Sequence, residues 1–285
     1  MNPKPVAVVS GASSGIGRSV VLKLLQMGYS VHGLARRLDA MADLASKGAI
    51  LHRLDLRDPS AISAFVRELV TQHGRIDVLI NNAGYGAYGA VEEVDLKAAR
   101  EQIEVNLFAP AQLIKETLPT MRAQRSGKIL NVSSIGGKVW SPLGAWYHAA
   151  KFGLEGFSDA LRNEVRPFGI DVIVIEPGGI KTEWSGIAVK NMLQNSSSGP
   201  YREIAEAFAT LSTSPQAEKM AAPPQVIADL IAKALLAAKP KARYVAPFSG
   251  KVILFLRYIL SDRMFDLFFC KAFRIPKTLG QAESV

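Results

Sequence analysis

Short apolar runs alternate with helix-periodic stretches through the first 180 residues, and this alternation leaves few folds open. The runs cover residues 6–9, 30–35, 49–54, 77–81, 128–132 and 171–175, and a further one follows at 243–246. They lack the polar alternation of half-exposed strands, so we expect a parallel sheet that is covered on both faces. Right-handed crossovers between its strands then predict an α/β fold with a doubly wound parallel sheet.

Helical periodicity places helices between these strands, at about 15–27, from 59 onward, and at 96–123, 146–166 and 226–238. From 183 to 224 the sequence becomes rich in Ser, Gly and Pro, which predicts a loop, a short helix and another loop. The length of 285 residues fits a single domain with an added segment. We therefore expect one domain over 1–248, which includes the loop at about 183–224, and a C-terminal helical extension over 249–285.

A glycine-rich turn joins the first expected strand to the first expected helix. Its sequence is Ser10-Gly11-Ala12-Ser13-Ser14-Gly15-Ile16-Gly17. Glycine permits a tight turn, lets a phosphate approach the backbone, and allows close packing of helix on strand. The N–H groups and the dipole at the helix start favour a pyrophosphate. The turn therefore predicts a dinucleotide site, although three glycines also suit a purely structural turn; the expected contacts are Gly11, Ser13, Ser14, Gly15, Ile16 and Gly17.

The end of the second expected strand distinguishes NADP from NAD. An acidic residue there binds the ribose hydroxyls of NAD, whereas arginine accommodates a 2′-phosphate. Here the strand ends in Leu34-Ala35-Arg36-Arg37, and guanidinium groups bind phosphate oxygens in a bidentate manner. We expect NADP(H) in preference to NAD(H), bound through Arg36 and Arg37. Two alternatives stay open, because both arginines also suit a solvated surface and the nearby Asp39 suits NAD.

Tyr147 and Lys151 are four residues apart in an expected helix, so both lie on one face, one turn apart. A free tyrosine has a pKa of about 10 and is a poor base at neutral pH. A nearby ammonium group favours the phenolate and lowers that pKa. The pair is therefore a candidate proton donor and acceptor. Ser133 and Ser134 follow a strand end, where α/β proteins form their sites, and offer a second hydroxyl.

Six ordered features of the chain together resemble the short-chain dehydrogenase/reductase family, over about residues 5 to 185. The first is the glycine turn, which matches the family's T-G-x-x-x-G-x-G with Ser10 in place of threonine. The others are Asp55, Asn81-Asn82-Ala83-Gly84, Asn106, the set Ser134, Tyr147 and Lys151, and Pro177-Gly178. The resemblance implies a Rossmann fold and an oxidoreductase that interconverts a carbonyl and an alcohol, with Tyr147 as the general acid and base.

The resemblance also assigns expected roles to single residues. It selects Ser134, 13 residues before Tyr147, to hold the substrate oxygen, and it leaves Ser133 as a structural hydroxyl. It implies that Asn106 kinks a helix and holds a water of a proton relay, although an ordinary core amide is an alternative. Expected cofactor contacts are Asp55 and Leu56 at the adenine, Asn82, Ala83 and Gly84 at the ribose, Tyr147 and Lys151, and Pro177, Gly178, Ile180 and Thr182 at the nicotinamide end.

The segment after Thr182 carries apolar side chains, including Trp184, so we expect an apolar substrate such as a steroid, a retinoid or a lipid. The resemblance to steroid, retinol and lipid carbonyl reductases points the same way. Alternatives are a catalytically silent NADP(H) sensor, a nucleotide-sugar epimerase or dehydratase, and a membrane-surface interaction protein on the same scaffold.

The extension over 249–285 mixes apolar residues with Lys and Arg, and three interpretations compete. It packs on the body or on a second subunit, it covers the substrate pocket, or it rests on a membrane surface as an amphipathic helix. The net charge of +9 is scattered and comes without a nucleic-acid-binding motif, so we expect no nucleic acid partner. One cysteine and four histidines give no metal pattern. We expect a cytoplasmic protein, and the resemblance implies a homodimer or homotetramer.

Overall fold

The structure is a computed structural model that describes residues 3–273 and 275 of the chain. Its described residues form a seven-stranded sheet in the order β3-β2-β1-β4-β5-β6-β7, in which every neighbouring pair is parallel. The strands are β1 (Val6–Ser10), β2 (Ser30–Ala35), β3 (Ile50–Arg53), β4 (Val78–Asn81), β5 (Gly127–Val132), β6 (Ile170–Pro177) and β7 (Arg243–Ala246). All seven predicted apolar runs are strands, and the predicted α/β fold is confirmed.

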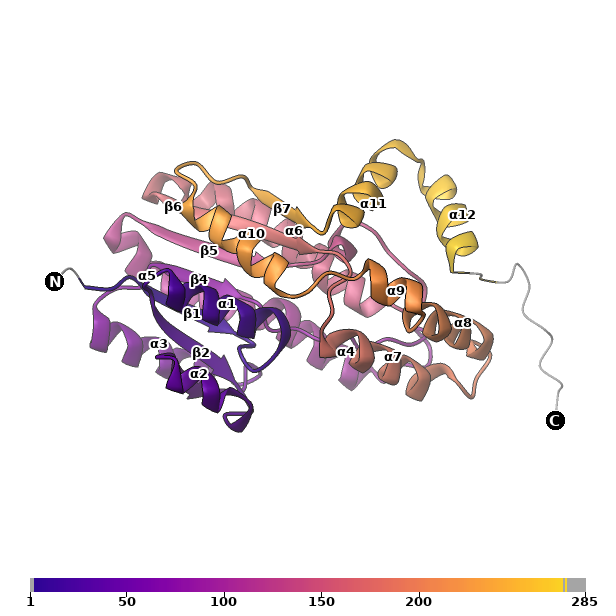
Figure 1. Ribbon diagram of the computed structural model, residues 1–285, viewed down its shortest axis with the longest axis horizontal. Coiled ribbons are helices and arrows are strands. Elements are labelled where there is room, and N and C mark those ends of the chain that lie inside the picture. Colours follow the sequence, from indigo (N-terminus) through magenta and orange to yellow (C-terminus); the bar gives the residue numbers. More distant parts are fainter. Residues whose placement is uncertain (1–2, 274, 276–285) are drawn as a thin grey trace.

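Helices cover both faces of this sheet (Figure 1). One face carries α1 (Gly15–Gln26), α2 (Ala42–Ser46) and α10 (Gln225–Leu236). The other carries α3 (Pro59–His73), α5 (Ala109–Gln124) and α6 (Ala145–Val165). Short 3-10 turns occupy η1 (Asp39–Met41), η3 (Ile135–Gly137) and η4 (Arg166–Phe168).

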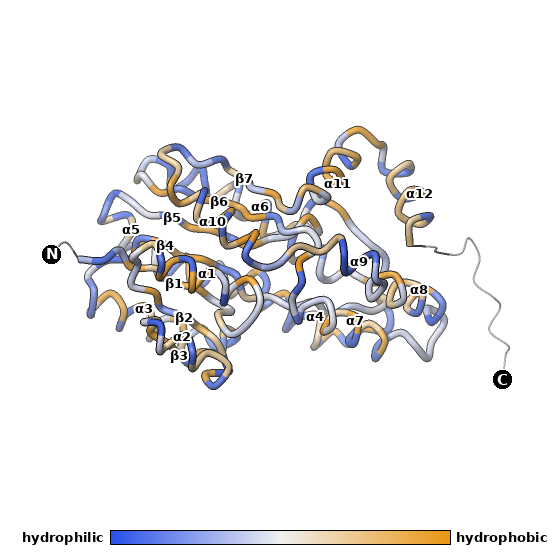
Figure 2. The backbone as a smooth tube through the Cα atoms, viewed as in Figure 1, coloured by the Kyte–Doolittle hydropathy of each residue, from blue (hydrophilic) through white to orange (hydrophobic). Residues whose placement is uncertain are grey.

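The inner strands β1, β4 and β6 lack polar alternation because both of their faces are buried. In β1, Ala7 and Val9 belong to the core under α1 and α10, whereas Val6 and Val8 belong to the core under α3 and α5. Successive side chains of a strand point to opposite faces, so each of these two cores requires its own apolar set. The tube coloured by hydropathy shows these strands as predominantly hydrophobic segments (Figure 2).

The chain reverses its strand order at β1, which pairs with β2 on one side and β4 on the other. The connections leaving β1 and β4 therefore diverge at the carboxyl edge of the sheet. Doubly wound proteins bind their ligands in the crevice at this point. The glycine turn follows β1, and residues 82–84 follow β4, so both segments meet there.

The predicted helix over 96–123 is interrupted. It consists of α4 (Leu96–Ile103), a π-helical turn labelled η2 (Glu104–Phe108), and α5. A π-helical turn contains one residue more per turn than the α-helix and shifts the side chains that follow it. Asn106 lies within this turn and is fully buried.

The prediction of a loop, a short helix and a loop for 183–224 was wrong. The segment contains α7 (Glu183–Ser196), α8 (Arg202–Ser212) and α9 (Pro215–Met220). Hydroxyl side chains cap two of these helices: the Thr182 side chain accepts from Trp184 N, and the Ser214 side chain accepts from Ala217 N. The two Ser-rich stretches mark the helix junctions, residues 196–200 between α7 and α8 and residues 212–215 between α8 and α9.

The C-terminal extension begins with two helices, α11 (Phe248–Ile259) and α12 (Asp262–Ala272). They form a V at the same end of the molecule as α7, α8 and α9 (Figure 1). Residues 274 and 276–285 of the predicted extension lie outside the described residues. Across the described ranges, no helix combines the length and the apolarity needed to cross a membrane.

Three of the four histidines gather at the β2–β3 edge of the sheet. His32 of β2 is fully buried, and its Nδ1 lies 3.0 Å from Nε2 of His52 on β3. The ring of His73, at the end of α3, lies 5.0 Å from the His32 ring. Burial lowers the pKa of His32 to about 4, and repulsion from His52 and His73 acts in the same direction. The folded protein therefore holds His32 in its neutral form at neutral pH.

We predict that this cluster makes the fold sensitive to mild acid. The unfolded chain binds a proton at His32 near pH 6.5, whereas the folded chain does so only near pH 4. Stability is therefore complete above pH 6.5 and falls as the pH drops toward 4. Urea unfolding should show a loss of roughly 1 to 2 kcal/mol between pH 7 and pH 5. A His32→Gln variant should lose less over the same interval; an equal loss in both proteins would contradict this origin.

Candidate functional site

A cleft of about 1670 Å³ opens at the carboxyl edge of the sheet. Its walls come from the glycine turn, from the segments after β2, β4, β5 and β6, from α6 and α7, and from the C-terminal helices. The predicted site residues that line it are Gly11, Ser13, Ser14, Gly15, Ile16, Arg36, Arg37, Asp55, Leu56, Asn82, Ala83, Gly84, Ser134, Tyr147, Lys151, Pro177, Gly178, Ile180 and Thr182. Gly17 and Asn106 are the two predicted residues that lie behind this wall.

The glycine turn has the geometry of a cradle for an extended anionic group. Gly11 and Gly15 adopt φ values of +68° and +54°, in the left-handed region that favours glycine. A side chain at Gly17 would collide with the Gly11 carbonyl oxygen and with the Asn82 side chain. Helix α1 starts here without a side-chain cap, so its first N–H groups remain available to a ligand. This cradle fits the pyrophosphate of a dinucleotide.

Asn82 joins the turn to β4 through several hydrogen bonds. Its side-chain Nδ2 donates to the carbonyl oxygens of Ser10 and Gly11, at 3.0 and 3.3 Å. The Ser10 hydroxyl accepts from the backbone N–H groups of Asn82 and Ala83, at 3.0 and 3.1 Å. The Asn82 amide therefore ties neighbouring strand ends together, while the segment 82–84 lines the cleft.

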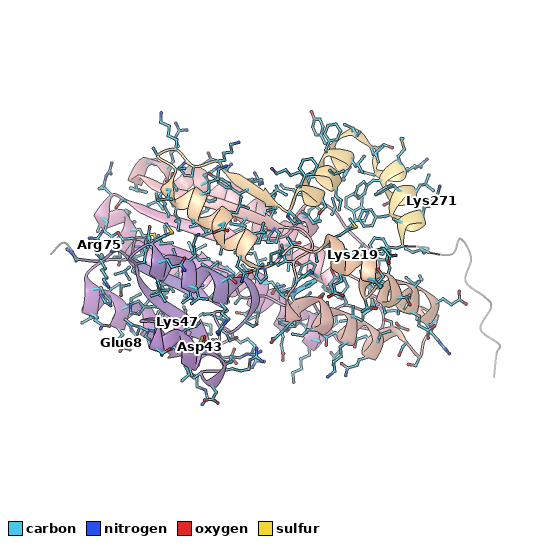
Figure 3. The ribbon with its side chains drawn as sticks, viewed as in Figure 1. Asp43, Lys47, Glu68, Arg75, Lys219 and Lys271 are labelled. Atoms are coloured by element: carbon cyan, nitrogen blue, oxygen red, sulfur yellow. The ribbon has the colours of Figure 1, made fainter. Side chains whose placement is uncertain are left out.

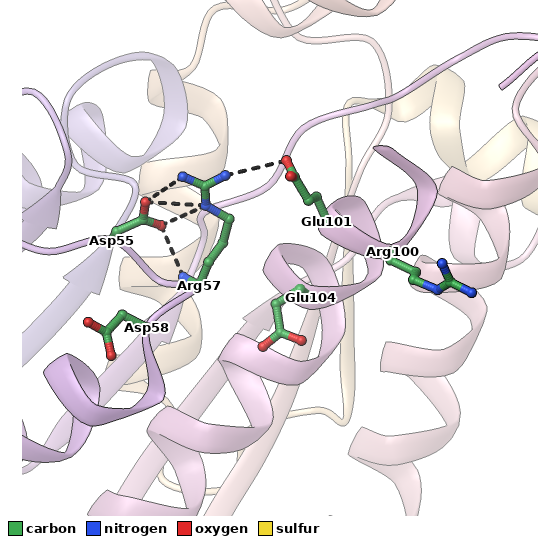
Figure 4. Close-up of a pocket in the computed structure, with 6 residues that line it drawn as sticks. All are labelled: Asp55, Arg57, Asp58, Arg100, Glu101 and Glu104. Carbon is green, nitrogen blue, oxygen red and sulfur yellow. Dashed lines mark hydrogen bonds and ion pairs between the residues drawn. The ribbon is translucent and has the colours of Figure 1, made fainter. Parts of the chain in front are cut away.

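The cationic end of the cleft follows β2. Arg37 forms an exposed ion pair with Glu183 at 3.4 Å, whereas Arg36 makes no ion pair with any described residue. Asp55 is held by Arg57, whose Nη2 lies 2.7 Å from Oδ2, and Arg57 also reaches Glu101 at 3.3 Å (Figure 4). Its hydrogen bond with Arg57 lowers the pKa of Asp55. Because Arg57 already neutralises this carboxylate, Arg36 remains available to an anionic ligand.

Tyr147 is nearly buried in the cleft wall, with 6% of its surface exposed. Burial raises the pKa of its phenol to about 12, and a hydrogen bond with Ser134 opposes this rise. Ser134 Oγ also accepts from Gly136 N at 2.9 Å, which fixes the position of the hydroxyl. Burial therefore sets the pKa of this phenol in the chain alone, and the lowering expected from Lys151 stays a prediction. The phenol is therefore protonated at neutral pH.

Lys151 lies one helical turn from Tyr147 and is 5% exposed. Its Nζ donates to the Val132 carbonyl oxygen at 2.9 Å. Burial lowers the pKa of the amine to about 8, and the negative charge of Glu155 opposes the shift. At neutral pH the side chain thus remains mostly cationic beside the cleft.

Asn106 supports the site from behind Gly84. Its Oδ1 accepts from Tyr85 N at 3.1 Å, and its Nδ2 donates to Tyr85 O at 2.8 Å. A side chain at Gly84 would lie 3.1 Å from the Asn106 oxygen and 3.6 Å from Lys151 Nζ. The amide therefore holds the loop after β4 close to the lysine, and it lies in the π-helical turn that separates α4 from α5.

Besides the neighbouring His148, two aromatic side chains lie near the Tyr147 ring. The ring of Trp184 lies 5.0 Å away, and the ring of Tyr88 lies 5.6 Å away. Trp184 was expected near the substrate, but Tyr88 was missed, because residues 84–90 carry no periodicity that reveals which side chain turns inward. Desolvation raises the pKa of Tyr88 well above its usual value, so this phenol stays neutral.

His148, which follows Tyr147 in α6, also lines the cleft. Its Nε2 accepts from Ser141 N at 2.9 Å, and its Nδ1 lies 2.9 Å from the Gly136 carbonyl oxygen. Both ring nitrogens thus bind the backbone segments beside Ser134 and Tyr147. The histidine shapes the cleft rather than serving as a proton carrier.

The C-terminal helices close one side of the cleft. Ile253 of α11 and Phe269 of α12 line it, together with Phe273 just after α12. The Phe273 ring stacks on Phe208 of α8 at 4.9 Å, and the fully buried Phe265 packs against Trp140 at 5.4 Å. The described part of the extension therefore fits two of the three interpretations at once. It packs on the body, and it covers the pocket.

Comparison with known proteins places this geometry in context. The short chain dehydrogenase family model matches residues 5–192. The NADPH-dependent 3-dehydrocapnine reductase of Ornithobacterium rhinotracheale is 35% identical over 277 residues, which cover 93% of this chain and 96% of the relative. The 3-ketodihydrosphingosine reductase of Bacteroides thetaiotaomicron is 37% identical over 182 residues, 64% of this chain and 66% of the relative.

Solved structures of the same family resemble this fold. A short-chain dehydrogenase from Streptomyces avermitilis superposes with a TM-score of 0.76 at 29% identity, over 96% of this chain and 98% of that one. A metagenomic short-chain oxidoreductase in complex with NADP gives a TM-score of 0.67 at 30% identity, over 85% of this chain and 96% of that one.

Proposed function

Because the chain is an oxidoreductase of the short-chain dehydrogenase/reductase family, we propose that it uses NADP(H) to interconvert a carbonyl group and a secondary or primary alcohol. The proposal rests on the set of residues that lines the cleft. Ser134, Tyr147 and Lys151 lie there together, on the same cleft as the glycine cradle.

The residues along the cleft suit the successive parts of a dinucleotide. The turn from Gly11 to Gly17 would hold the pyrophosphate, and Arg36 and Arg37 the 2′-phosphate. Asp55, Leu56 and the segment 82–84 would lie along the adenosine, and Pro177, Gly178, Ile180 and Thr182 along the nicotinamide end. When bound, such a cofactor supplies or accepts a hydride.

Ser134 and Tyr147 would act on the oxygen of the substrate. The Ser134 hydroxyl donates a hydrogen bond to the carbonyl oxygen and stabilises the charge that develops on it. Tyr147 gives its proton to the same oxygen during reduction and takes one back during oxidation. The pKa of about 12 keeps this phenol protonated in the chain alone, which is the form that reduction requires. The Lys151 cation stabilises the phenolate that remains and holds the ribose.

The substrate end of the cleft supports an apolar substrate. Trp184, Ile253, Phe269 and Phe273 give it aromatic and aliphatic walls. One relative is named for 3-ketodihydrosphingosine, a lipid ketone. Among steroid, retinoid and lipid substrates, we therefore propose a lipid-like ketone.

Two further expectations remain proposals. The protein forms a homodimer or homotetramer, and it is located in the cytoplasm. Light scattering of the purified protein measures the first, and fractionation of cells that produce it measures the second.

We predict that Tyr147→Phe lowers the turnover of a ketone substrate by about 10²–10⁴-fold, because the proton donor is lost. The assay follows NADPH consumption over a panel of steroid ketones, retinal, 3-oxoacyl esters and simple aldehydes. NADPH affinity, measured by fluorescence, should stay within a few-fold of the parent value.

Tyr244→Phe is the matched control, because it removes another buried phenolic hydroxyl, one that accepts from Lys241 N outside the cleft. Its turnover should remain close to that of the parent. Near-normal turnover in Tyr147→Phe would refute the assignment of the proton donor.

We predict that Arg36→Ser combined with Arg37→Ser lowers the ratio of NADPH to NADH affinity by at least about tenfold, because charge-assisted bonds to the 2′-phosphate are lost. Isothermal titration with both nucleotides measures the ratio. Arg202→Ser removes an exposed arginine of α8 and should leave it unchanged. A parent protein that prefers NADH, or a double variant that loses both affinities equally, would contradict the proposed phosphate site.

A further inference from the structure

The two C-terminal helices have apolar side chains on their outward faces as well as toward the cleft. On α11, Phe248, Val252, Phe255 and Ile259 are 75%, 43%, 61% and 55% exposed. Their spacing of three or four residues places them in one stripe along the helix. On α12, Met264, Leu267 and Phe268 are exposed. Together these seven side chains form the outer apolar surface.

The inward faces of the same helices are already occupied. Ile253 and Phe269 line the cleft, and Phe265 is fully buried against Trp140. Packing on the body therefore explains one face of each helix but leaves the seven side chains of the outer apolar surface exposed. Figure 2 shows hydrophobic stretches continuing along α11 and α12, away from the sheet. An exposed apolar surface of this kind marks an interaction site.

The charges beside the outer apolar surface are positive. Lys251, Arg263 and Lys271 are exposed there, and Figure 3 shows Lys271 extending away from α12. The acidic residues of the two helices are engaged elsewhere: Asp262 Oδ1 lies 2.7 Å from Arg257, and Asp266 accepts from Trp140 Nε1 at 2.8 Å. The exposed apolar side chains are thus accompanied by cations that lack an acidic partner within the described residues.

We propose that the outer apolar surface docks on an anionic lipid membrane. Aromatic and aliphatic side chains next to lysine and arginine match the acyl region and the acidic headgroups of such a surface. A second copy of the chain would bring the same cations against each other, which disfavours it. Helix α11 has 12 residues and is about 18 Å long, shorter than the roughly 30 Å core of a bilayer. The helices therefore lie along the interface.

This orientation connects the membrane to the proposed chemistry. The helices that meet the lipid with one face line the cleft with the other, through Ile253 and Phe269. A lipid ketone that leaves the membrane surface would then cross only a short distance of water before it enters the cleft. This step rests on the proposed function, whereas lipid binding itself needs neither substrate nor cofactor.

Vesicle co-sedimentation of the full-length protein tests the proposal. We expect the bound fraction to rise at least about tenfold when phosphatidylglycerol is added to phosphatidylcholine vesicles, and to fall again at high salt. The double variant Phe255→Ser/Phe268→Ser should lose this binding, and so should Lys251→Glu/Lys271→Glu. Leu236→Ser is the matched control, because Leu236 is 76% exposed on α10, outside the outer apolar surface, and it should bind like the parent.

The turnover of a water-soluble ketone, measured without vesicles, tests the proposed function independently of membrane docking. We expect Phe255→Ser/Phe268→Ser to retain that turnover, which also shows that the variant is folded. The docking proposal is overturned if the parent stays in the supernatant with both kinds of vesicle, or if the aromatic variant binds as the parent does. A parent oligomer that dissociates in the aromatic variant would assign the surface to a second copy and would overturn it too.

Discussion

Parallel pairing of seven strands is the constraint on which the site depends, because it brings all their carboxyl ends to one edge. Residues separated by more than a hundred positions, such as Gly11 and Tyr147, line one cleft for this reason. The close contact of the first turn with β4 requires glycine at Gly17, where any side chain would meet Asn82 and the Gly11 carbonyl. Fold and cofactor cradle therefore arise from the same packing.

Desolvation determines the chemistry at this edge. The wall that contains Tyr147 is closed by Trp184, Tyr88 and the C-terminal helices, so water does not stabilise a phenolate there. The same burial lowers the pKa of Lys151 and raises that of Tyr147. The chain alone thus holds a neutral phenol next to a cation. For oxidation, Tyr147 would have to act as a base, and this would require a further positive charge near the phenol. Reduction would not require that charge, because the phenol is already protonated.

Patterns local in sequence predicted most of the sheet and most of the cleft lining. Doubly buried strands are recognisable as unbroken apolar runs, and motifs that follow strand ends must meet at one edge. Three features depended on tertiary contacts that spacing does not encode. Helices α7 and α8 form where Ser196, Met192 and Ala205 become buried. Tyr88 turns inward from an aperiodic loop. The pKa of Tyr147 follows its burial rather than its distance from Lys151 along the helix. The roles of the individual site residues remain predictions.

The protonation state of Tyr147 is the central claim, and NMR of protein labelled with ¹³C at the tyrosine Cζ measures it directly. The Tyr147 signal is assigned by its absence from a protein with phenylalanine at that position. The account predicts that this signal keeps the chemical shift of a protonated phenol up to about pH 10 in the free protein and moves toward the phenolate value when NADP⁺ is added. A free protein in which Tyr147 is already ionised near neutral pH, or a signal that NADP⁺ leaves unmoved, would contradict it.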